Sequence, residues 1–277
     1  MFQPVIPLTG NSGWKFLEAT YDRQLESHSN SAQVRLDRDY LVEKFSRPIT
    51  VENFLDDRRL LRVALTAFDL GGEEWKRGFV DKVLSEVSDP ESTFLARLNN
   101  AKYTAFAKAL KPISGTIYFS PEEIAGIADN FETASFKAAV GEVDDSMRLS
   151  LNYKSEIGKI AGSGSSEEAI LYRILGDVPT RTLLEGATNL PSDIGKLPIE
   201  RQAVILKESL QRTFGIREMS ELTSPENINR VIQRFHAMES IAQGMANYSS
   251  ASAALTLLGG GSGLGSQGSA NLFLSLL

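Results

Sequence analysis

Apolar residues recur at every third or fourth position along most of the chain. The stretch 50–68 shows the pattern most clearly, because its apolar side chains share one broad helical face: Val51, Phe54, Leu55, Leu61, Leu65 and Phe68. Segment 73–87 repeats the period with Trp75, Phe79, Val83 and Leu84. The period returns in segments 131–160 and 167–176, and from Pro225 to about Leu258. Strand-like alternation is scarce, and residues 115–119 form either a short strand or an extended linker. The pattern predicts an all-α fold, a helical bundle.

Capping residues mark several of the predicted helix starts. Thr50 can accept a hydrogen bond from the free N–H groups of the helix that follows it. The segment Ser120–Glu123 has the sequence of a capping box, with proline in the first helical turn. Within the long helical region 131–160, we expect the breaks to fall at Gly141 and Gly158, because glycine is a poor helix former.

Three pairs of segments line up in the same order along the chain: 60–70 with 181–191, 80–86 with 205–211, and 88–98 with 223–235. In the first pair, Ala67 matches Ala187 and Leu70 matches Leu190. Amphipathic helices with similar caps also resemble one another by chance. The shared order of the three blocks favours two diverged helical repeats.

These observations divide the chain into five segments: an N-terminal arm and helices (1–49), a first helical repeat (50–115), connecting helices (116–176), a second helical repeat (177–248), and an uncharged Gly/Ser-rich tail with an apolar end (249–277). No charged residue follows Glu239, and the glycine-rich segment 259–268 is predicted to be a flexible linker. The apolar end either docks on a partner or folds back on the chain's own core.

Composition excludes several classes of function. The 277 residues include 29 basic and 35 acidic side chains, a net charge of −6, with no basic block. A nucleic-acid-binding protein needs a positive face, so we expect no nucleic-acid partner. The absence of cysteine rules out disulfides, thiolate metal sites and cysteine nucleophiles. The two histidines leave little for a metal site or for histidine-based catalysis.

The sequence also bears on location. The first ten residues lack the positive end and the apolar run of a secretory signal, and two prolines interrupt them. No window reaches the roughly 18 consecutive apolar residues of a membrane span. We therefore expect synthesis in the cytoplasm and no membrane span. Export by a route that does not read a cleaved signal stays open.

Several local patterns resemble functional motifs. Gly263, Gly265 and Gly268 match G-x-G-x-x-G, but no strand, helix or later acid accompanies them, so no dinucleotide is expected. The run Asp56–Asp57 is typical of charge in a first helical turn, since adjacent helical positions do not face each other. His28 lies in a polar stretch and is expected to be exposed.

His236 is expected to be a packing or surface residue. Ser163 and Ser165 lie in a glycine loop without a base or a nucleophile elbow. The sequence therefore predicts no catalytic, cofactor-binding or metal-binding residue. Carboxylates brought together from distant helices would escape this reasoning.

Three blocks carry a family resemblance: the opening F-x-P-x-x-P-x-x-G-x-x-G-W-x-F-L, the segment 54–70 (FLDDRRLLRVALTAFDL), and the segment 176–191 (GDVPTRTLLEGATNLP). They resemble an alphaproteobacterial family, domain of unknown function 1217, from residue 2 to about residue 245. The resemblance implies a largely helical protein whose gene lies among flagellar genes. It implies no catalytic residues.

The favoured hypothesis is a non-enzymatic, flagellum-associated structural or assembly protein that acts through protein–protein contacts. The alternatives are a cytoplasmic helical adaptor, export chaperone or regulator and, more remotely, an enzyme with a dispersed acidic site. The expected partners are flagellar or other proteins, including a second copy of the chain. The residues predicted to bind them are apolar and lie toward the two ends: Trp14, Phe16, Leu17, Leu272, Phe273 and Leu276.

Overall fold

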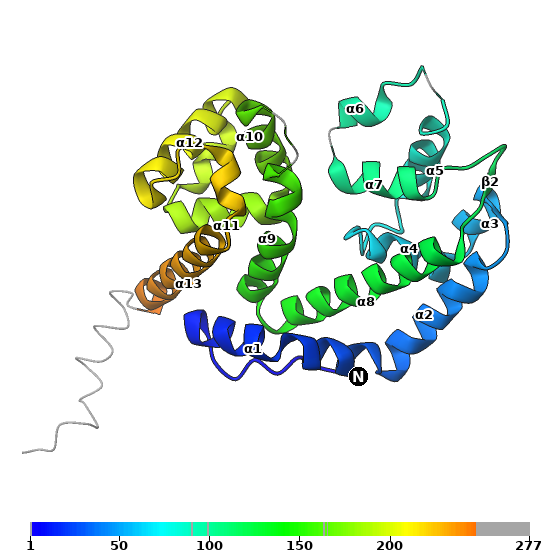
Figure 1. The fold of residues 1–277 in the computed structure, drawn as a ribbon, viewed down its shortest axis with the longest axis horizontal. Helices are drawn as coiled ribbons and strands as arrows, with labels where there is room; N and C mark the ends of the chain where they lie inside the picture. Colours follow the sequence, from blue (N-terminus) through cyan, green and yellow to red (C-terminus); the bar gives the residue numbers. More distant parts are fainter. Residues whose placement is uncertain (1, 90, 99, 163, 165, 248–277) are drawn as a thin grey trace, which may run out of the picture.

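The computed structural model describes residues 2–89, 91–98, 100–162, 164 and 166–247. These residues form thirteen α-helices, two short 3-10 helices and one two-stranded sheet, so the predicted all-α class is confirmed. Figure 1 shows two lobes side by side above a base of long helices. The predicted tail, 249–277, lies outside the described residues.

The base consists of three helices: α1 (Gly10–Ser29), α2 (Ala32–Phe45) and α8 (Pro121–Val143). The first lobe follows α2 and contains β1 (Ile49–Thr50), α3 (Val51–Asp56), α4 (Arg58–Ala67), α5 (Arg77–Glu86), α6 (Phe94–Leu98), α7 (Ala101–Ala109) and β2 (Thr116–Ile117). The two strands pair antiparallel, with Ile49 opposite Ile117 and Thr50 opposite Thr116. Segment 115–119 therefore contains a strand of two residues.

The second lobe follows α8 and contains α9 (Asp145–Ala161), α10 (Glu167–Gly176), α11 (Val178–Thr188), η1 (Ser192–Lys196), α12 (Ile199–Phe214), η2 (Met219–Thr223) and α13 (Pro225–Asn247). Helix α13 contacts α1, so the base and the second lobe are joined on that side (Figure 1). None of the helices in the described part of the chain is both long enough and apolar enough to cross a bilayer.

Each lobe has its own apolar core, and α8 contributes to both. Ile124, Ile127 and Phe131, in its first half, pack with α2 and the first lobe. Phe136 and Val140, in its second half, pack with α1 and the second lobe. The predicted connecting segment 116–176 is thus divided between two cores and forms no unit of its own.

An aspartate, and not a glycine, interrupts the helical region 131–160. Helix α8 continues through Gly141 and α9 continues through Gly158, contrary to the prediction. The break falls at Asp144, whose carboxylate accepts from the backbone N–H groups of Ser146 (2.9 Å) and Met147 (3.3 Å). An aspartate that satisfies free N–H groups at a helix start makes a new helix as favourable as continuation of the old one.

The helix predicted over 50–68 divides for the same reason. Asp57 leaves the helical conformation, and its carboxylate caps α4 by accepting from the Leu60 N–H at 3.0 Å. The prediction that Asp56–Asp57 lies within one first turn is therefore wrong for Asp57. The caps predicted at Thr50 and at Ser120–Glu123 are both present.

The structure bears on the repeat prediction only in part. Helices α4 and α11, which hold the first matched pair, end alike: Asp69 and Asn189 both have φ of 55°. The following N–H groups, of Leu70 and Leu190, each donate back to the fifth residue before them at 2.9 Å. In the third pair, however, the matched segments form helices of very different length: α6 has five residues and α13 has 23. The duplication stays a prediction.

Candidate functional site

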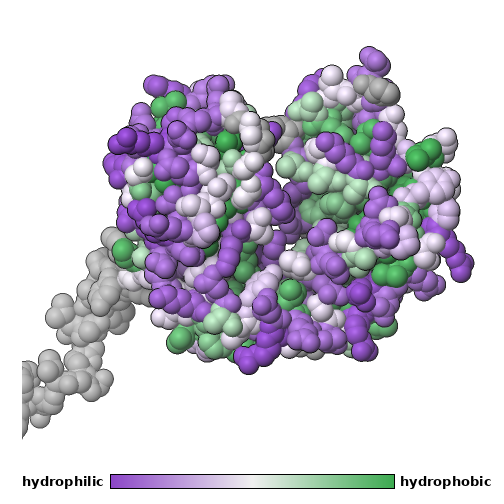
Figure 2. Space-filling model, viewed as in Figure 1, coloured by the Kyte–Doolittle hydropathy of each residue, from purple (hydrophilic) through white to green (hydrophobic). Residues whose placement is uncertain are grey.

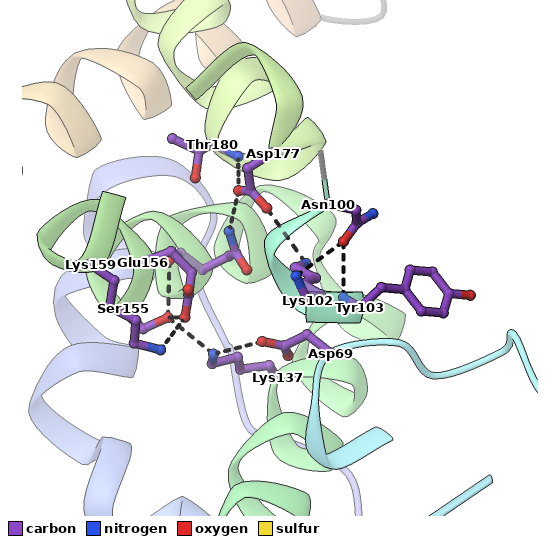
Figure 3. A network of polar contacts seen from close by, with 11 residues as sticks. Asp69, Asn100, Lys102, Tyr103, Lys137, Ser155, Glu156, Lys159, Asp177 and Thr180 are labelled. Carbon is purple, nitrogen blue, oxygen red and sulfur yellow. Dashed lines mark hydrogen bonds and ion pairs between the residues drawn. The ribbon is translucent and has the colours of Figure 1, made fainter. Parts of the chain in front are cut away.

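A network of polar side chains crosses between the lobes above α8. Figure 2 shows a notch between the two lobes on this face, and Figure 3 shows the side chains that meet there. Asp69 and Lys102 come from the first lobe, Lys137 comes from α8, and Ser155 and Asp177 come from the second lobe. We call these residues, together with Asn152, the polar junction.

Lys137 is the centre of one half of the polar junction. Its side chain is buried, and its ammonium donates to the Ser155 hydroxyl at 3.0 Å. The Asp69 carboxylate lies 3.8 Å from the same ammonium. Ser155 in turn donates to the carbonyl of Asn152 at 3.0 Å. One buried cation therefore ties α8 to α9 and to the loop that ends α4.

Asp177 is the centre of the other half. One carboxylate oxygen caps α11 by accepting from the Thr180 N–H at 3.1 Å, and it also accepts from the Asn152 side-chain amide at 3.3 Å. The other oxygen lies 3.6 Å from the Lys102 ammonium. Lys102 sits at the start of α7, where the Asn100 side chain caps the helix. This ion pair joins the two lobes directly.

The polar junction pairs opposite charges between the lobes and α8. Each lysine faces a carboxylate, and each carboxylate faces a lysine, so an incoming charged group would have to displace an existing partner. Among the described residues, no group of three or more His, Asp or Glu side chains is placed to hold a metal ion.

The predicted partner-binding residues of α1 do not share one surface. Trp14 and Leu17 are buried in the second lobe's core and form no part of the surface of the chain as folded here, and their contact with a partner stays a prediction. Helices α8 and α13 contact α1 and help to cover these side chains. Phe16 is half-buried and lines a pocket of about 230 Å³ with Phe2 and Gln24. Leu272, Phe273 and Leu276 lie outside the described residues.

His28 is buried, and the prediction that it is exposed is wrong. Its ring lies between Phe2 (centroids 5.4 Å apart) and Phe136 (5.6 Å), and its Nε2 is 2.9 Å from the Ser135 hydroxyl. That hydroxyl donates its own proton to the Glu132 carbonyl, so Nε2 must carry the proton of this contact. Burial lowers the pKa of His28.

His236 has a similar environment near the start of α1. Its ring stacks on Trp14 with centroids 6.0 Å apart, and its Nε2 lies 2.9 Å from the Ser150 hydroxyl, which donates to the Ser146 carbonyl. Its Nδ1, like that of His28, is buried without a hydrogen-bond partner. Burial lowers the pKa of His236 to about 4, although the Asp144 carboxylate favours the charged ring.

Trp75 was missed as a surface residue by the periodicity. The predicted helix over 73–87 starts only at Arg77, and Trp75 lies before it with 75% of its side chain exposed. Glu73 fixes this loop by accepting from the Tyr103 phenol and from the Lys76 ammonium (2.9 Å). The same ammonium lies 5.2 Å from the centre of the Trp75 ring. The Gly71–Gly72 pair before it was the available signal that the helix had not yet begun.

The contacts in this loop also shift the pKa values of its ionisable groups. Burial opposes charge on Glu73, but the hydrogen bonds from Tyr103 and Lys76 outweigh it, and the pKa of Glu73 lies below its ordinary value. Burial and the hydrogen bond to Glu73 together raise the pKa of Tyr103 far above its ordinary value. Both groups therefore keep the charge states that hold the loop through the neutral pH range.

Comparison with known proteins places the chain in a family. The family model described as "Protein of unknown function (DUF1217)" matches residues 67–228. The chain belongs to this family. The stretch that matches DUF1217 contains every residue of the polar junction and also Trp75, whereas α1 and the segment before it lie outside the match.

A solved structure shares the DUF1217 chain's fold. It is the crystal structure of a protein from Agrobacterium tumefaciens, with a TM-score of 0.66 and 20% sequence identity. The similarity covers 87% of this chain and 99% of that chain, so the shared fold extends over nearly all of that protein. No curated protein matches the DUF1217 chain.

Proposed function

We propose that this chain is a non-enzymatic protein that acts through protein–protein contacts in the structure or assembly of the flagellum. The proposal of protein–protein contacts rests on Trp75, which is 75% exposed. Trp75 lies on a loop that is held by hydrogen bonds from Lys76 and Tyr103 to Glu73. Tryptophan is among the residues that contribute most to binding energy when an interface covers them.

The fastening of the loop matters for affinity. A flexible surface tryptophan loses conformational freedom when it binds, and that loss offsets part of the gain. Here Glu73 is bound on two sides, and the Lys76 ammonium already lies over one face of the indole. The loop therefore loses little further conformational freedom when a partner binds. Burial of the Trp75 ring would then contribute most of its transfer free energy to the stability of the complex.

The flagellar setting rests on the family. The resemblance implies a gene among flagellar genes, and the family membership over residues 67–228 supports that resemblance. A cysteine-free chain of 277 residues also suits a protein that passes between compartments of different redox state, since it forms no disulfide on the way. These features support the proposal of a structural or assembly role.

The contact hypothesis is tested by cross-linking in the cells that encode the chain. Trp75→Ala should remove the cross-linked partner, whereas Leu36→Ala, which truncates a comparably exposed apolar side chain on α2, should not. Equal cross-linking by the Trp75→Ala variant and the unaltered chain would contradict a contact at this loop.

The flagellar hypothesis needs a separate test. Immunoblots of cytosol, culture supernatant and purified hook–basal bodies should show the protein outside the cytosol, and an export-deficient strain should lose that fraction. Protein confined to the cytosol in both strains would favour an adaptor, export chaperone or regulator over an exported component. Normal swimming and normal basal bodies in a deletion strain would count against any flagellar role.

A further inference from the structure

The segment before α1 lies along the helix as an extended peptide in a groove. We call residues 2–9 the N-terminal arm; in Figure 1 it runs back beneath α1 toward the start of that helix. Its side chains alternate: Phe2, Pro4 and Ile6 are at least partly buried, whereas Gln3 and Val5 are exposed. Phe2 packs against His28 and Phe136, and Ile6 packs against the second lobe's core. The groove thus has apolar positions for alternate residues of an extended chain.

Gln24 of α1 binds the backbone of the N-terminal arm. Its side-chain oxygen accepts from the Val5 N–H at 2.8 Å, and its amide nitrogen donates to the Val5 carbonyl at 3.1 Å. The amide's second N–H goes to the Thr20 hydroxyl at 2.8 Å, and that hydroxyl donates to the Phe16 carbonyl. Thr20 therefore fixes the orientation of the Gln24 amide. The amide then offers the backbone of Val5 one acceptor and one donor, as a neighbouring β-strand would.

This geometry defines what the groove recognises. Main-chain bonding at one residue requires a free N–H there but places no demand on its side chain. Relative to the residue that Gln24 binds, the groove accommodates a large apolar residue three places earlier, a proline one place earlier and an aliphatic residue one place later. The complementary ligand is an extended peptide with this pattern, and each copy of the chain presents it in residues 2–6.

The turn between the N-terminal arm and α1 is separate from the groove. Gly10 has φ of 60°, and the Leu8 carbonyl lies against Gly13 so closely that a Cβ at residue 13 would be 2.0 Å from the Leu8 oxygen. The chain can therefore fold its own N-terminal arm back only because residue 13 has no side chain. An N-terminal arm from another molecule would make the same groove contacts without needing this turn.

We propose that the groove beside α1 is a peptide-docking site, and that its partner is the N-terminal arm of a second copy, exchanged for the one seated there. Exchange of an identical segment keeps every groove contact and gives up only the turn, which is why it is a low-cost route to a dimer. The polar groups that select the ligand are the Gln24 amide and the Thr20 hydroxyl that holds it.

The test uses a side chain at residue 13 to prevent the turn and leaves the residues of the groove unchanged. In the full-length chain, Gly13→Ala should convert a monomer into a dimer, measured by light scattering after size exclusion. Gly78→Ala is the matched control, because a Cβ there meets nothing within 4 Å, and it should stay monomeric. The new methyl at residue 13 also meets the Met147 methyl at 2.8 Å, which is the free end of a flexible side chain.

Two further measurements make the result decisive. Adding Gln24→Leu to Gly13→Ala should return the dimer to monomer, and excess synthetic peptide of residues 2–9 should do the same. The peptide with proline at position 5, which lacks the N–H that Gln24 accepts, should have no effect. A Gly13→Ala chain that stays monomeric, or a dimer indifferent to Gln24→Leu and to both peptides, would overturn the proposal.

If Gly13→Ala prevents folding, as judged by loss of helical circular dichroism, the unaltered chain still provides a test. A fluorescent peptide of residues 2–9 should bind it slowly, as the resident N-terminal arm leaves, and the peptide with proline at position 5 should not bind. Binding of neither peptide, or of both equally, would contradict a groove that reads the backbone of residue 5.

Discussion

His236 should make the folded chain sensitive to mild acid. The unfolded chain binds a proton at an ordinary imidazole, with a pKa of 6.5, whereas the buried ring takes one up only near pH 4. The folded pKa is depressed, so the stability that depends on the neutral ring is present above pH 6.5. It is lost as the pH falls toward 4, because protons then favour the unfolded chain.

The magnitude follows from the two pKa values. With 6.5 for the unfolded chain and about 4 for the folded chain, the free energy of unfolding falls by about 2 kcal/mol between pH 7 and pH 5 on account of His236 alone. The structural reason is that a protonated Nδ1 would carry charge and a donor into a site where it has no partner. His28 acts in the same direction, because burial also lowers its pKa.

The assay is urea unfolding followed by circular dichroism, with the full-length chain and the His236→Gln variant at about pH 7 and about pH 5. Glutamine retains an N–H that can donate to Ser150 but takes up no proton. The difference in unfolding free energy between the two chains should change by about 2 kcal/mol between the two pH values, in favour of the variant at low pH.

The comparison isolates His236 because other titrating groups are common to both chains. Asp57 and Glu73 have lowered pKa values, so their stabilising effects persist at pH 5 and are lost only at still lower pH. His28→Gln should give a second, independent shift of the same sign. A difference between the unaltered chain and His236→Gln that is the same at both pH values would refute the reasoning about the unpartnered Nδ1.

Substitutions at three further positions test packing, the polar junction and the surface. Gly186→Ala should lower the unfolding free energy by about 1–3 kcal/mol in urea titrations, because its Cβ would lie 2.9 Å from the rigid Phe235 ring where α11 meets α13. Asp177→Asn keeps a cap for α11 but weakens the pair with Lys102, so it should cost less than about 1 kcal/mol. Asp177→Ala should cost about 1 kcal/mol more, through loss of the cap. Trp75→Ala should leave the melting temperature nearly unchanged, since surface substitutions usually stay within about 0.5 kcal/mol; a large drop would show that the indole supports the fold.

The local features of the fold could be predicted where one short segment contains all the groups involved. Thr50 and Ser120 cap helices because their partners lie three residues away, within reach of any chain that starts a helix there. The breaks at Asp57 and Asp144 could not be predicted with the same certainty. An aspartate beside other charged residues suits a first helical turn as well as a cap, and packing around it decides between the two.

Burial was harder to predict than periodicity. The periodicity placed Trp75 on an apolar helical face, but Trp75 is exposed, whereas Trp14, which was predicted to bind a partner, is buried. Periodicity identifies which side chains share a face, but it does not say whether another helix covers that face. The same limit hid His28, whose polar neighbours in sequence are not its neighbours in space.

The polar junction lay beyond sequence reasoning for a related reason. Asp69, Lys102, Lys137 and Asp177 are far apart in the chain, and each alone resembles an ordinary surface charge. Only the angle between α8 and the two lobes brings them together. Gln24 is similar, since nothing in its sequence setting indicates that its amide binds the backbone of Val5.

Helix α8 gives the molecule an unusual mechanical property. Its 23 residues span about 35 Å, and its two halves are buried in different cores. Because one rigid helix forms part of both cores, we expect a binding partner that tilts one lobe to disturb the packing of the other. A cut between Phe131 and Phe136 should leave both cores open and should not release two folded domains.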